Sequence, residues 1–423
     1  MKKAKKITLP NGLRIVLVPE PDARAATALI LVQAGSMYET KRVNGVSHFL
    51  EHMVFKGTAN HPEPGMIAHE LTALGARFDA FTDQEHTGYY VKVQAGKFPK
   101  ALAIVSDLYL HPLFDPREIE KERGVIIQEI NMYEDDLPAR AARIFNKLMY
   151  GDQPAGWDVA GEKPVVRRLG RDDFIDYRAR RYVMPGTVIT VAGKFDERAA
   201  VAQIKEAFGG IRRRPAAPMK RTAVRQSSPR LAVHYKESDQ AHIVLGFRAF
   251  GMFDRRRHAL RALGDILGGG MSSRLFMRVR EKMGAAYYIG AGGDLSLDHG
   301  HFSIAAGVNH AQLNDVIRAI LDECRRLRDE MVPAAEFRKS KDHLVGGMIL
   351  GLETSDDLAS FYGGQEILGR PALSPEEVIA KIKAVTAEEV HAVARTIMKN
   401  NGLNLAIVGP YKQQAPFRKI LTL

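Results

Sequence analysis

The residues best suited to chemistry in this chain are two histidines and a glutamate in the segment His48-Phe-Leu-Glu-His52. His48 and His52 are four residues apart, so on an α-helix their imidazoles project from the same face, with Glu51 beside them. A hydrolytic zinc centre uses two imidazoles and an adjacent carboxylate, and H-x-x-E-H is the inverted form of the H-E-x-x-H zinc motif. So short a motif is also compatible with a core helix that carries two hydrogen-bonded histidines.

The flanking residues predict the helix that would position these groups. Asn44 and Gly45 are suited to a helix start. Apolar residues follow at helical spacing, at Val46, Phe49, Leu50 and Met53. The histidines are therefore expected on a buried or half-buried helix.

A second helix is predicted to supply a third ligand, because a catalytic zinc usually takes three protein groups and leaves a fourth position for water. Asp115 is a good helix cap, Pro116 suits the first helical position, and Glu118 follows three residues after the cap. On this helix Glu122 and Glu129 are seven residues apart and share a face. Glu122 is either a partner that orients a histidine or an exposed glutamate in a charged run.

This arrangement resembles the M16 metallopeptidases, since 76 residues separate His52 from Glu129 in an E-x-x-x-x-x-x-E-I run. The segments that look like the family, in family order, are His48 to Thr58, Gly75 to Tyr90, Asp115 to Asp136 and Arg274 to Tyr287. The resemblance implies that His48, His52 and Glu129 bind one Zn²⁺ per chain. It also implies that Glu51 is the general base that takes a proton from metal-bound water.

The same resemblance implies roles for two further groups of residues. Arg280 and Tyr287 match an arginine and tyrosine that the family's C-terminal domains use on the substrate near the scissile bond, where they help stabilise the oxyanion. The strand that contains Asp79, Ala80, Phe81 and Thr82 resembles the family strand to which an extended peptide adds by main-chain hydrogen bonds. Many relatives carry asparagine at position 79, so Asp79 departs from the pattern by losing a donor.

A weak internal repeat with a period near 215 residues predicts duplicated halves. The matching strands are Thr27 to Val32 with Ala241 to Gly246, and Val188 to Gly193 with Leu403 to Gly409. We predict an N-terminal domain at 1–211 with the zinc site, a linker at 212–229 rich in proline and charge, and a C-terminal domain at 230–423. The second domain lacks the metal residues, because Ala259 to Ile266, at the position of the H-x-x-E-H helix, contains no histidine.

The predicted fold class is α+β, with two homologous layered domains. Each is expected to have a mainly antiparallel sheet with helices packed on one face. Predicted helices are 97–110 and 314–328, and predicted hairpins join 76–82 to 87–93 and 287–291 to 300–306. The family resemblance implies that the two domains form half of a clam-like chamber.

Other conspicuous residues are expected to be structural. His61, His69, His86 and His111 lack partners at ligand spacing. The glycines at 268–270 lack the G-K-[ST] of a phosphate loop, which favours a flexible turn.

Composition sets the broad class. A chain of 423 residues with 45% hydrophobic residues can build the cores of a large globular enzyme. Cys324 is the one cysteine, so no internal disulfide forms, and no apolar run is long enough to span a membrane.

The basic start, from Met1 through Lys2 to Lys6, lacks the apolar stretch of a signal peptide, so a cytoplasmic location is expected. The net charge of +12 is scattered and accompanies no nucleic-acid-binding motif.

The function predicted from the sequence is a zinc endopeptidase that hydrolyses unfolded oligopeptides inside a closed chamber. The chain is half the length of the single-chain family members and carries both sets of residues, so a homodimer is expected, or a heterodimer with a paralogue. The alternatives are a narrow or partner-dependent processing peptidase, a non-catalytic peptide-binding subunit, and a nucleic-acid-binding protein suggested by charge alone. Neither nucleic acid nor membrane is an expected partner.

Overall fold

The computed structural model describes residues 4–423, which fold into two compact units. Unit 1 contains Met1–Ile130, Asp158–Lys220 and Ile349–Glu376, and unit 2 contains Asn131–Trp157, Arg221–Met348 and Glu377–Leu423. Residues 1–3, part of the basic start, lie outside the described residues. Each unit thus includes chain from both halves of the sequence, and the domain boundaries inferred from the repeat stay a prediction.

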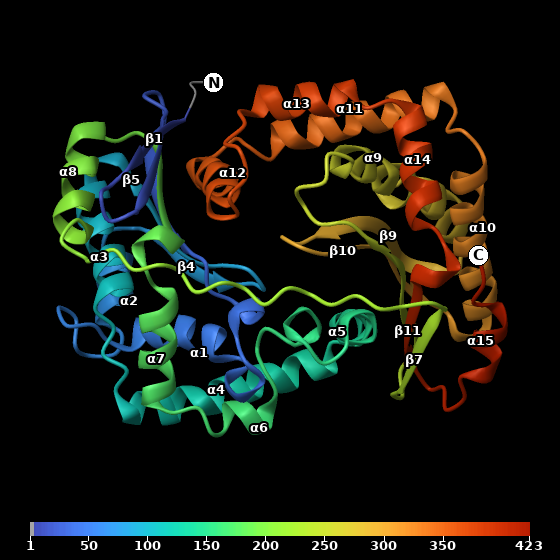
Figure 1. Ribbon diagram of the computed structural model, residues 1–423, viewed down its shortest axis with the longest axis horizontal. Coiled ribbons are helices and arrows are strands. Elements are labelled where there is room, and N and C mark those ends of the chain that lie inside the picture. The colour runs from blue at the N-terminus through green and yellow to red at the C-terminus, as the bar shows by residue number, and fades with distance from the viewer. Residues whose placement is uncertain (1–3) are drawn as a thin grey trace. The chain divides into compact units, whose positions relative to one another are not determined.

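Unit 1 is built on a six-stranded sheet in the order β1-β2-β6-β3-β5-β4 (Figure 1). Its strands are β1 (Lys5–Thr8), β2 (Arg14–Pro19), β3 (Ala25–Val32), β4 (Arg77–Thr82), β5 (Thr87–Gln94) and β6 (Thr187–Gly193). All neighbours are antiparallel except β2 and β6, which are parallel. The predicted hairpin is confirmed as β4 and β5, and it leaves β4 at the edge of the sheet.

Both faces of this sheet are buried. Along β3, Ile30 faces a core that contains Phe49 of α1 (Val46–Met53) and Leu102 of α3 (Phe98–Leu110). Leu31 faces the opposite side, where it shares a core with Tyr362 of α12 (Ser355–Ile367). The other helices of unit 1 are α2 (Met66–Ala73), α6 (Lys163–Val166), α7 (Arg171–Arg181) and α8 (Glu197–Phe208).

The helix on the second face, α12, comes from the C-terminal half of the sequence. The prediction placed helices on one face, but β3 is apolar on both sides, so both need a cover. Contact is close at Gly363, where a Cβ atom would lie 2.7 Å from Thr190 Oγ1. A larger residue at this position would push α12 from the sheet.

Unit 2 has a five-stranded sheet in the order β7-β11-β8-β10-β9, which repeats the order of β2-β6-β3-β5-β4 in unit 1 (Figure 1). Its strands are β7 (Arg230–Tyr235), β8 (Ala241–Ala249), β9 (Ala286–Leu295), β10 (Gly300–Val308) and β11 (Leu403–Gly409). The single parallel pair, β7 with β11, corresponds to β2 with β6 of unit 1. The predicted hairpin of β9 and β10, the predicted duplication and the mainly antiparallel α+β class are confirmed.

Helices of both sequence halves build unit 2. Helix α5 (Leu137–Tyr150) packs on β8 and β11, although it precedes them by a long stretch of chain. Helix α9 (Arg257–Gly268) contacts β9 as α1 contacts β4, but it carries His258 without a second histidine. The remaining helices are α10 (Leu313–Asp329), α14 (Ala387–Ile397) and α15 (Ala415–Ile420).

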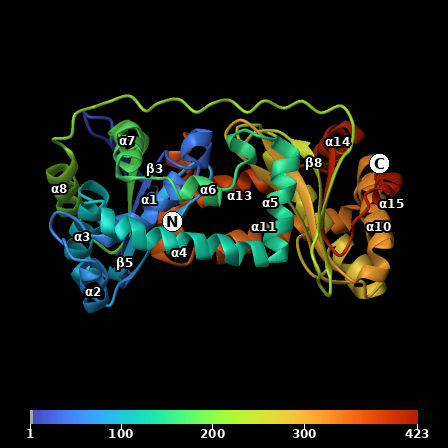
Figure 2. The ribbon, with the colours of Figure 1, turned by 90° about the horizontal axis from the view of Figure 1, so that it is seen from below.

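Three helices continue across the division between the units. They are α4 (Pro116–Asp135), a long unbroken helix in Figure 2, α11 (Ala334–Leu350) and α13 (Pro375–Ala384). Residues 212–229 form neither a helix nor a strand. Among the described residues, no helix has both the length and the apolar character needed to cross a bilayer.

Candidate metal centre

The helix that carries the H-x-x-E-H motif is anchored at its start by a buried carboxylate. Gly45 has φ 96°, a left-handed conformation that favours glycine, and α1 begins at the next residue. The Glu39 carboxylate accepts hydrogen bonds from Asn44 Nδ2 at 2.9 Å, Gly45 N at 2.8 Å and Ser47 N at 2.8 Å. Ser47 Oγ donates to it as well, at 2.7 Å, and lies 2.7 Å from the hydroxyl of Tyr177. Glu39 therefore satisfies the free amides at the start of α1 that no side chain at the cap position reaches.

Two histidine nitrogens converge on one carboxylate. His48 Nε2 lies 3.4 Å from Glu129 Oε1, and His52 Nε2 lies 3.5 Å from Glu129 Oε2. His48, His52 and Glu129 each offer one ligand atom, and these three atoms lie within 4.8 Å of one another. Within the described part of the chain, this is the one cluster of three such groups. The structure therefore brings together the three residues predicted to be metal ligands.

The spacing of these atoms fits a tetrahedral zinc ion. Ligand atoms about 2.1 Å from zinc in a tetrahedron are separated from one another by about 3.4 Å. The two nitrogen–oxygen distances, 3.4 and 3.5 Å, each to a different oxygen of Glu129, are close to that separation and exceed the usual length of a hydrogen bond. Two imidazoles and one carboxylate are also a donor set typical of catalytic zinc.

Glu122 holds the imidazole of His52 from the side away from the cluster. His52 Nδ1 lies 2.8 Å from Glu122 Oε1, and Lys56 Nζ lies 2.6 Å from Glu122 Oε2. Burial raises the pKa of the Glu122 carboxyl, but its bonds to His52 and Lys56 outweigh burial and leave this pKa below its usual value. An ionised Glu122 favours the proton on Nδ1, which leaves the lone pair of Nε2 facing Glu129.

Glu51 lies beside the cluster with one oxygen free of protein partners. Its carboxylate is hydrogen-bonded to Thr82 of β4, and its buried Oε2 atom has no hydrogen-bond partner in the part of the chain that the structure describes. Burial is the largest influence on Glu51 and raises the pKa of its carboxyl, against the opposing effects of Thr82 and the two histidines. A carboxylate with a raised pKa is a better proton acceptor at neutral pH.

The predicted substrate strand, residues 79–82, lies in β4 at the free edge of the sheet. Thr82 links this strand to Glu51, so the edge begins next to the cluster. Near its middle, the Ala80 N–H donates to Asp79 Oδ1 at 2.9 Å. Asp79 therefore occupies an edge amide that a peptide added to β4 would need, and Phe81 is half-buried on the side of the sheet that α12 covers.

Arg280 and Tyr287 are neighbours within unit 2. The Arg280 guanidinium lies 5.9 Å from the centroid of the Tyr287 ring and 4.9 Å from that of Phe276. The Tyr287 side chain is 75% exposed at the start of β9. The pair is thus assembled and accessible from solvent.

Two of the remaining histidines contact one buried aspartate. His61 Nδ1 lies 3.0 Å from Asp107 Oδ2, and His111 Nδ1 lies 2.9 Å from Asp107 Oδ1. His86 lies 3.0 Å from Asp83, and His69 is exposed on α2. None of these four histidines belongs to the group that His48, His52 and Glu129 form among the described residues.

Several residues that hold the centre were missed in the sequence. Glu39, Tyr177 and Lys56 contact residues of the motif helix or Glu122, yet none stands at a spacing that a motif would reveal. Thr82 was predicted as part of the substrate strand, but its contact with Glu51 was not. Such contacts depend on tertiary structure. Glu39 precedes the start of α1, and an acidic residue at such a place can cap a helix. Its burial, which would have marked it as a structural residue, could not be predicted from the polar residues around it.

Comparisons with known proteins agree with this geometry. Residues 14–163 match the family model Insulinase (Peptidase family M16), and residues 168–344 match Peptidase M16 inactive domain. An uncharacterized zinc protease of Mycobacterium tuberculosis is 36% identical over 410 residues, which cover 96% of this chain and 93% of that protein. One of Bacillus subtilis is 32% identical over 408 residues, covering 96% of this chain and 98% of that protein.

Solved structures show the same fold. A protease from Helicobacter pylori superposes with a TM-score of 0.88 at 21% identity, covering 96% of this chain and 99% of its own. A peptidase M16 inactive domain from Pseudomonas fluorescens has a TM-score of 0.90 at 19% identity, covering 98% and 99%. Together with the sequence matches, these likenesses confirm the resemblance found in the motif and its spacing: the chain belongs to peptidase family M16.

Proposed function

We propose that this protein is a zinc-dependent endopeptidase that cleaves unfolded oligopeptides. The observation that carries the proposal is the convergence of His48 Nε2 and His52 Nε2 on the Glu129 carboxylate, at the separation of ligands that share one zinc ion. The names of the relatives, zinc proteases, support the same metal. One Zn²⁺ per chain would be held by these three residues.

The bound zinc would supply Lewis-acid chemistry, lowering the pKa of a coordinated water to about 7 and polarising the scissile carbonyl. Glu51 takes the proton of the attacking water on Oε2, the oxygen that has no protein partner among the described residues. It then passes this proton to the leaving amine. Thr82 keeps the Glu51 carboxylate in place through the transfer, and Glu122 keeps His52 in the tautomer that faces the metal.

The substrate is proposed to add as a strand to the free edge of β4. Main-chain hydrogen bonds to this edge read the peptide backbone, which suits a broad range of sequences. Folded proteins present few free strands, so this mode favours unfolded peptides. Asp79 must release the Ala80 amide when a peptide pairs there.

Arg280 and Tyr287 are proposed to bind the substrate backbone and stabilise the oxyanion of the tetrahedral intermediate. A guanidinium and a phenol are both donors, and preorganised donors are among the largest contributors to catalysis of acyl transfer. The accessible ring of Tyr287 and its neighbour Arg280 supply such a pair.

A homodimer that encloses the substrate in a closed chamber is the proposed assembly, with a heterodimer of this chain and a paralogue as the second form. Its support is that one chain of 423 residues carries both the metal residues and the Arg280–Tyr287 pair. Size-exclusion chromatography of the purified chain tests it. A monomer that retains full activity would contradict the enclosed dimer.

The test of the proposed function compares wild type with Glu51→Gln, using a quenched fluorescent peptide and metal analysis. We expect one zinc per chain in both proteins and a fall in kcat of at least about 1,000-fold in the variant, since its amide cannot accept the proton. Glu63→Gln, a change of an exposed glutamate outside the centre, is the matched control and should keep wild-type activity. Full activity in Glu51→Gln would remove the proposed base, whereas zinc-loaded wild type without hydrolysis would favour a peptide-binding subunit.

A further inference from the structure

The segment that carries Arg280 has an unusual backbone. Residues Phe276–Lys282 form a π-helix, and the Met283 amide bonds to the Arg278 carbonyl, five residues earlier, at 3.1 Å. A π-helix is rare and less stable than an α-helix, and such turns occur frequently at functional sites. Contacts from outside the segment are therefore needed to keep its shape.

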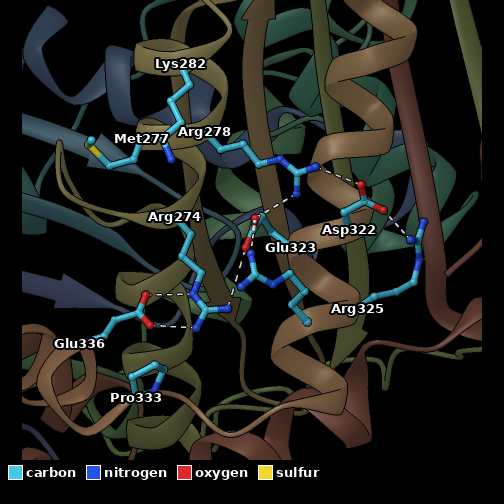
Figure 3. Close-up of a pocket in the computed structure, with 10 residues that line it drawn as sticks. Arg274, Met277, Arg278, Lys282, Asp322, Glu323, Arg325, Pro333 and Glu336 are labelled. Atoms are coloured by element: carbon cyan, nitrogen blue, oxygen red, sulfur yellow. Dashed lines mark hydrogen bonds and ion pairs between the residues drawn. The ribbon is translucent and has the colours of Figure 1, made fainter.

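Arg278 of this segment and Arg274 in the turn before it are bound by acidic residues of α10 and α11, as Figure 3 shows. Arg278 places Nη1 2.9 Å from Glu323 Oε1 and Nη2 3.0 Å from Asp322 Oδ2. Arg274, one turn earlier, makes a bidentate pair with Glu336, with both distances 2.8 Å. Arg274 also lies 3.8 Å from Glu323 Oε2. These side chains line a pocket of about 720 Å³, and the charged groups that line it form ion pairs with one another.

Glu323 is the buried member of this group. Its residue is 4% exposed, and its Oε2 atom has no hydrogen bond within the described part of the chain. Arg326 Nη1 also lies 3.4 Å from Glu323 Oε1. Removing a carboxylate from water costs free energy that ion pairs often do not return in full, so apolar side chains of similar volume often stabilise a buried position at least as well. The burial of Glu323 among these arginines is therefore explained better by the orientation that it gives to Arg278 and Arg274 than by a gain in stability.

The opposite side of the same segment carries Arg280. Its exposed guanidinium makes no ion pair within residues 4–423 and lies over the rings of Phe276 and Tyr287. Because Arg278 and Arg280 belong to the same helical segment, a rotation that frees Arg278 also turns Arg280 away from Tyr287. Fixing one side of the segment fixes the direction of the other.

We propose that Glu323 is a positioning residue, which acts through Arg278 and Arg274 to hold the π-helical segment with Arg280 beside Tyr287. The inference rests on the proposed function, in which Arg280 and Tyr287 contact the substrate. The ion pairs of Glu323 with Arg278 and Arg274 would then act on the reaction through the position of Arg280.

The kinetic test is a double-mutant cycle on the zinc-loaded enzyme with a quenched fluorescent peptide. Glu323→Gln keeps the shape of the side chain and removes its charge, and we expect kcat/KM to fall on the order of tenfold. In an Arg280→Ala background the same change should cost less than about twofold, because the group that it positions is already gone. Asp315→Asn, which breaks an exposed ion pair on the same helix, is the matched control and should leave kcat/KM unchanged. An equal loss in both backgrounds would show a general structural effect and overturn the proposal.

Hydrogen exchange of the 276–282 amides provides a second readout that does not depend on catalysis. We expect exchange there to be about tenfold faster in Glu323→Gln than in wild type, with little change in β10. Arg278→Lys, which keeps the charge but cannot bridge Glu323 and Asp322 as a guanidinium does, should act in the same direction and serves if Glu323→Gln fails to fold. Unchanged exchange in a folded variant would overturn the proposed role of Glu323 in holding residues 276–282, without affecting the proposed function. An inactive zinc-loaded wild type would overturn the proposed function.

Discussion

His52 Nδ1 and Glu122 Oε1 are 2.8 Å apart, and this contact fixes which nitrogen of His52 faces Glu129. Glu122→Gln should therefore weaken zinc binding by about 10- to 100-fold, because a neutral amide holds the tautomer less firmly. Chelator competition on the purified proteins measures this affinity. Glu120→Gln changes an exposed glutamate of the same helix and should bind zinc as wild type does. Wild-type affinity in Glu122→Gln would leave Glu122 without a role at the metal.

In the proposed binding mode Asp79 would compete with the substrate for the Ala80 amide, so its removal should favour peptide binding. We expect Asp79→Ala to lower KM by about 3- to 10-fold, the effect of a hydrogen bond worth about 1 kcal/mol. Steady-state kinetics with a neutral peptide checks the prediction. Asp83→Ala, in the turn that follows β4, controls for the loss of a negative charge nearby. A higher KM in Asp79→Ala would instead assign the carboxylate a direct contact with the substrate.

Glu39 is expected to support the metal centre through stability alone. Glu39→Ala leaves the amides of Gly45 and Ser47 and the side chain of Asn44 without their acceptor, which should cost about 3 kcal/mol of unfolding free energy. Urea denaturation measures the loss. Glu197→Ala, which breaks an exposed ion pair with Lys5 in the same unit, should cost less than about 1 kcal/mol. Equal stability of the two variants would contradict the role assigned to Glu39.

Asp107 should make part of the stability dependent on pH. Burial raises the pKa of its carboxyl, but hydrogen bonds from Thr58, His111, His61 and Asn60 outweigh burial and leave this pKa below its usual value. Since the folded state favours the ionised form, the stabilisation is present above the unfolded pKa of about 3.9 and is lost as the pH falls through the lower folded pKa.

Urea denaturation of wild type and Asp107→Asn at about pH 5 and about pH 3.5 tests this sign. The difference in unfolding free energy between the two proteins should be larger at the higher pH. A difference that grows on acidification would mean that the folded state prefers the protonated carboxyl.

The sequence predicted that His48, His52 and Glu129 lie together, because the two histidines stand at helical spacing and the family resemblance pointed to the distant Glu129. The spacing of His48 and His52 fixes their relation on one helix, and the cap at Asp115 fixes the phase of the helix that carries Glu129. The strand repeat likewise predicted two similar sheets, since buried strands are short apolar runs that stand out in a sequence.

Features that depend on tertiary contacts were not predictable in this way. Nothing near 355–367 indicates that α12 covers the sheet of the N-terminal half, because its partners Leu31 and Thr190 lie far away in the chain. The π-helical form of Phe276–Lys282 was not predicted either, because the contact of Arg278 with Glu323 of α10 joins residues that no local pattern connects.

The measurement that tests the central claim most directly is a crystal structure of the zinc-loaded protein with anomalous data at the zinc edge. We predict a single strong peak per chain, within about 2.0–2.2 Å of His48 Nε2, His52 Nε2 and a Glu129 oxygen. A stoichiometric zinc peak bound by other residues, with Glu129 turned away from both imidazoles, would contradict it.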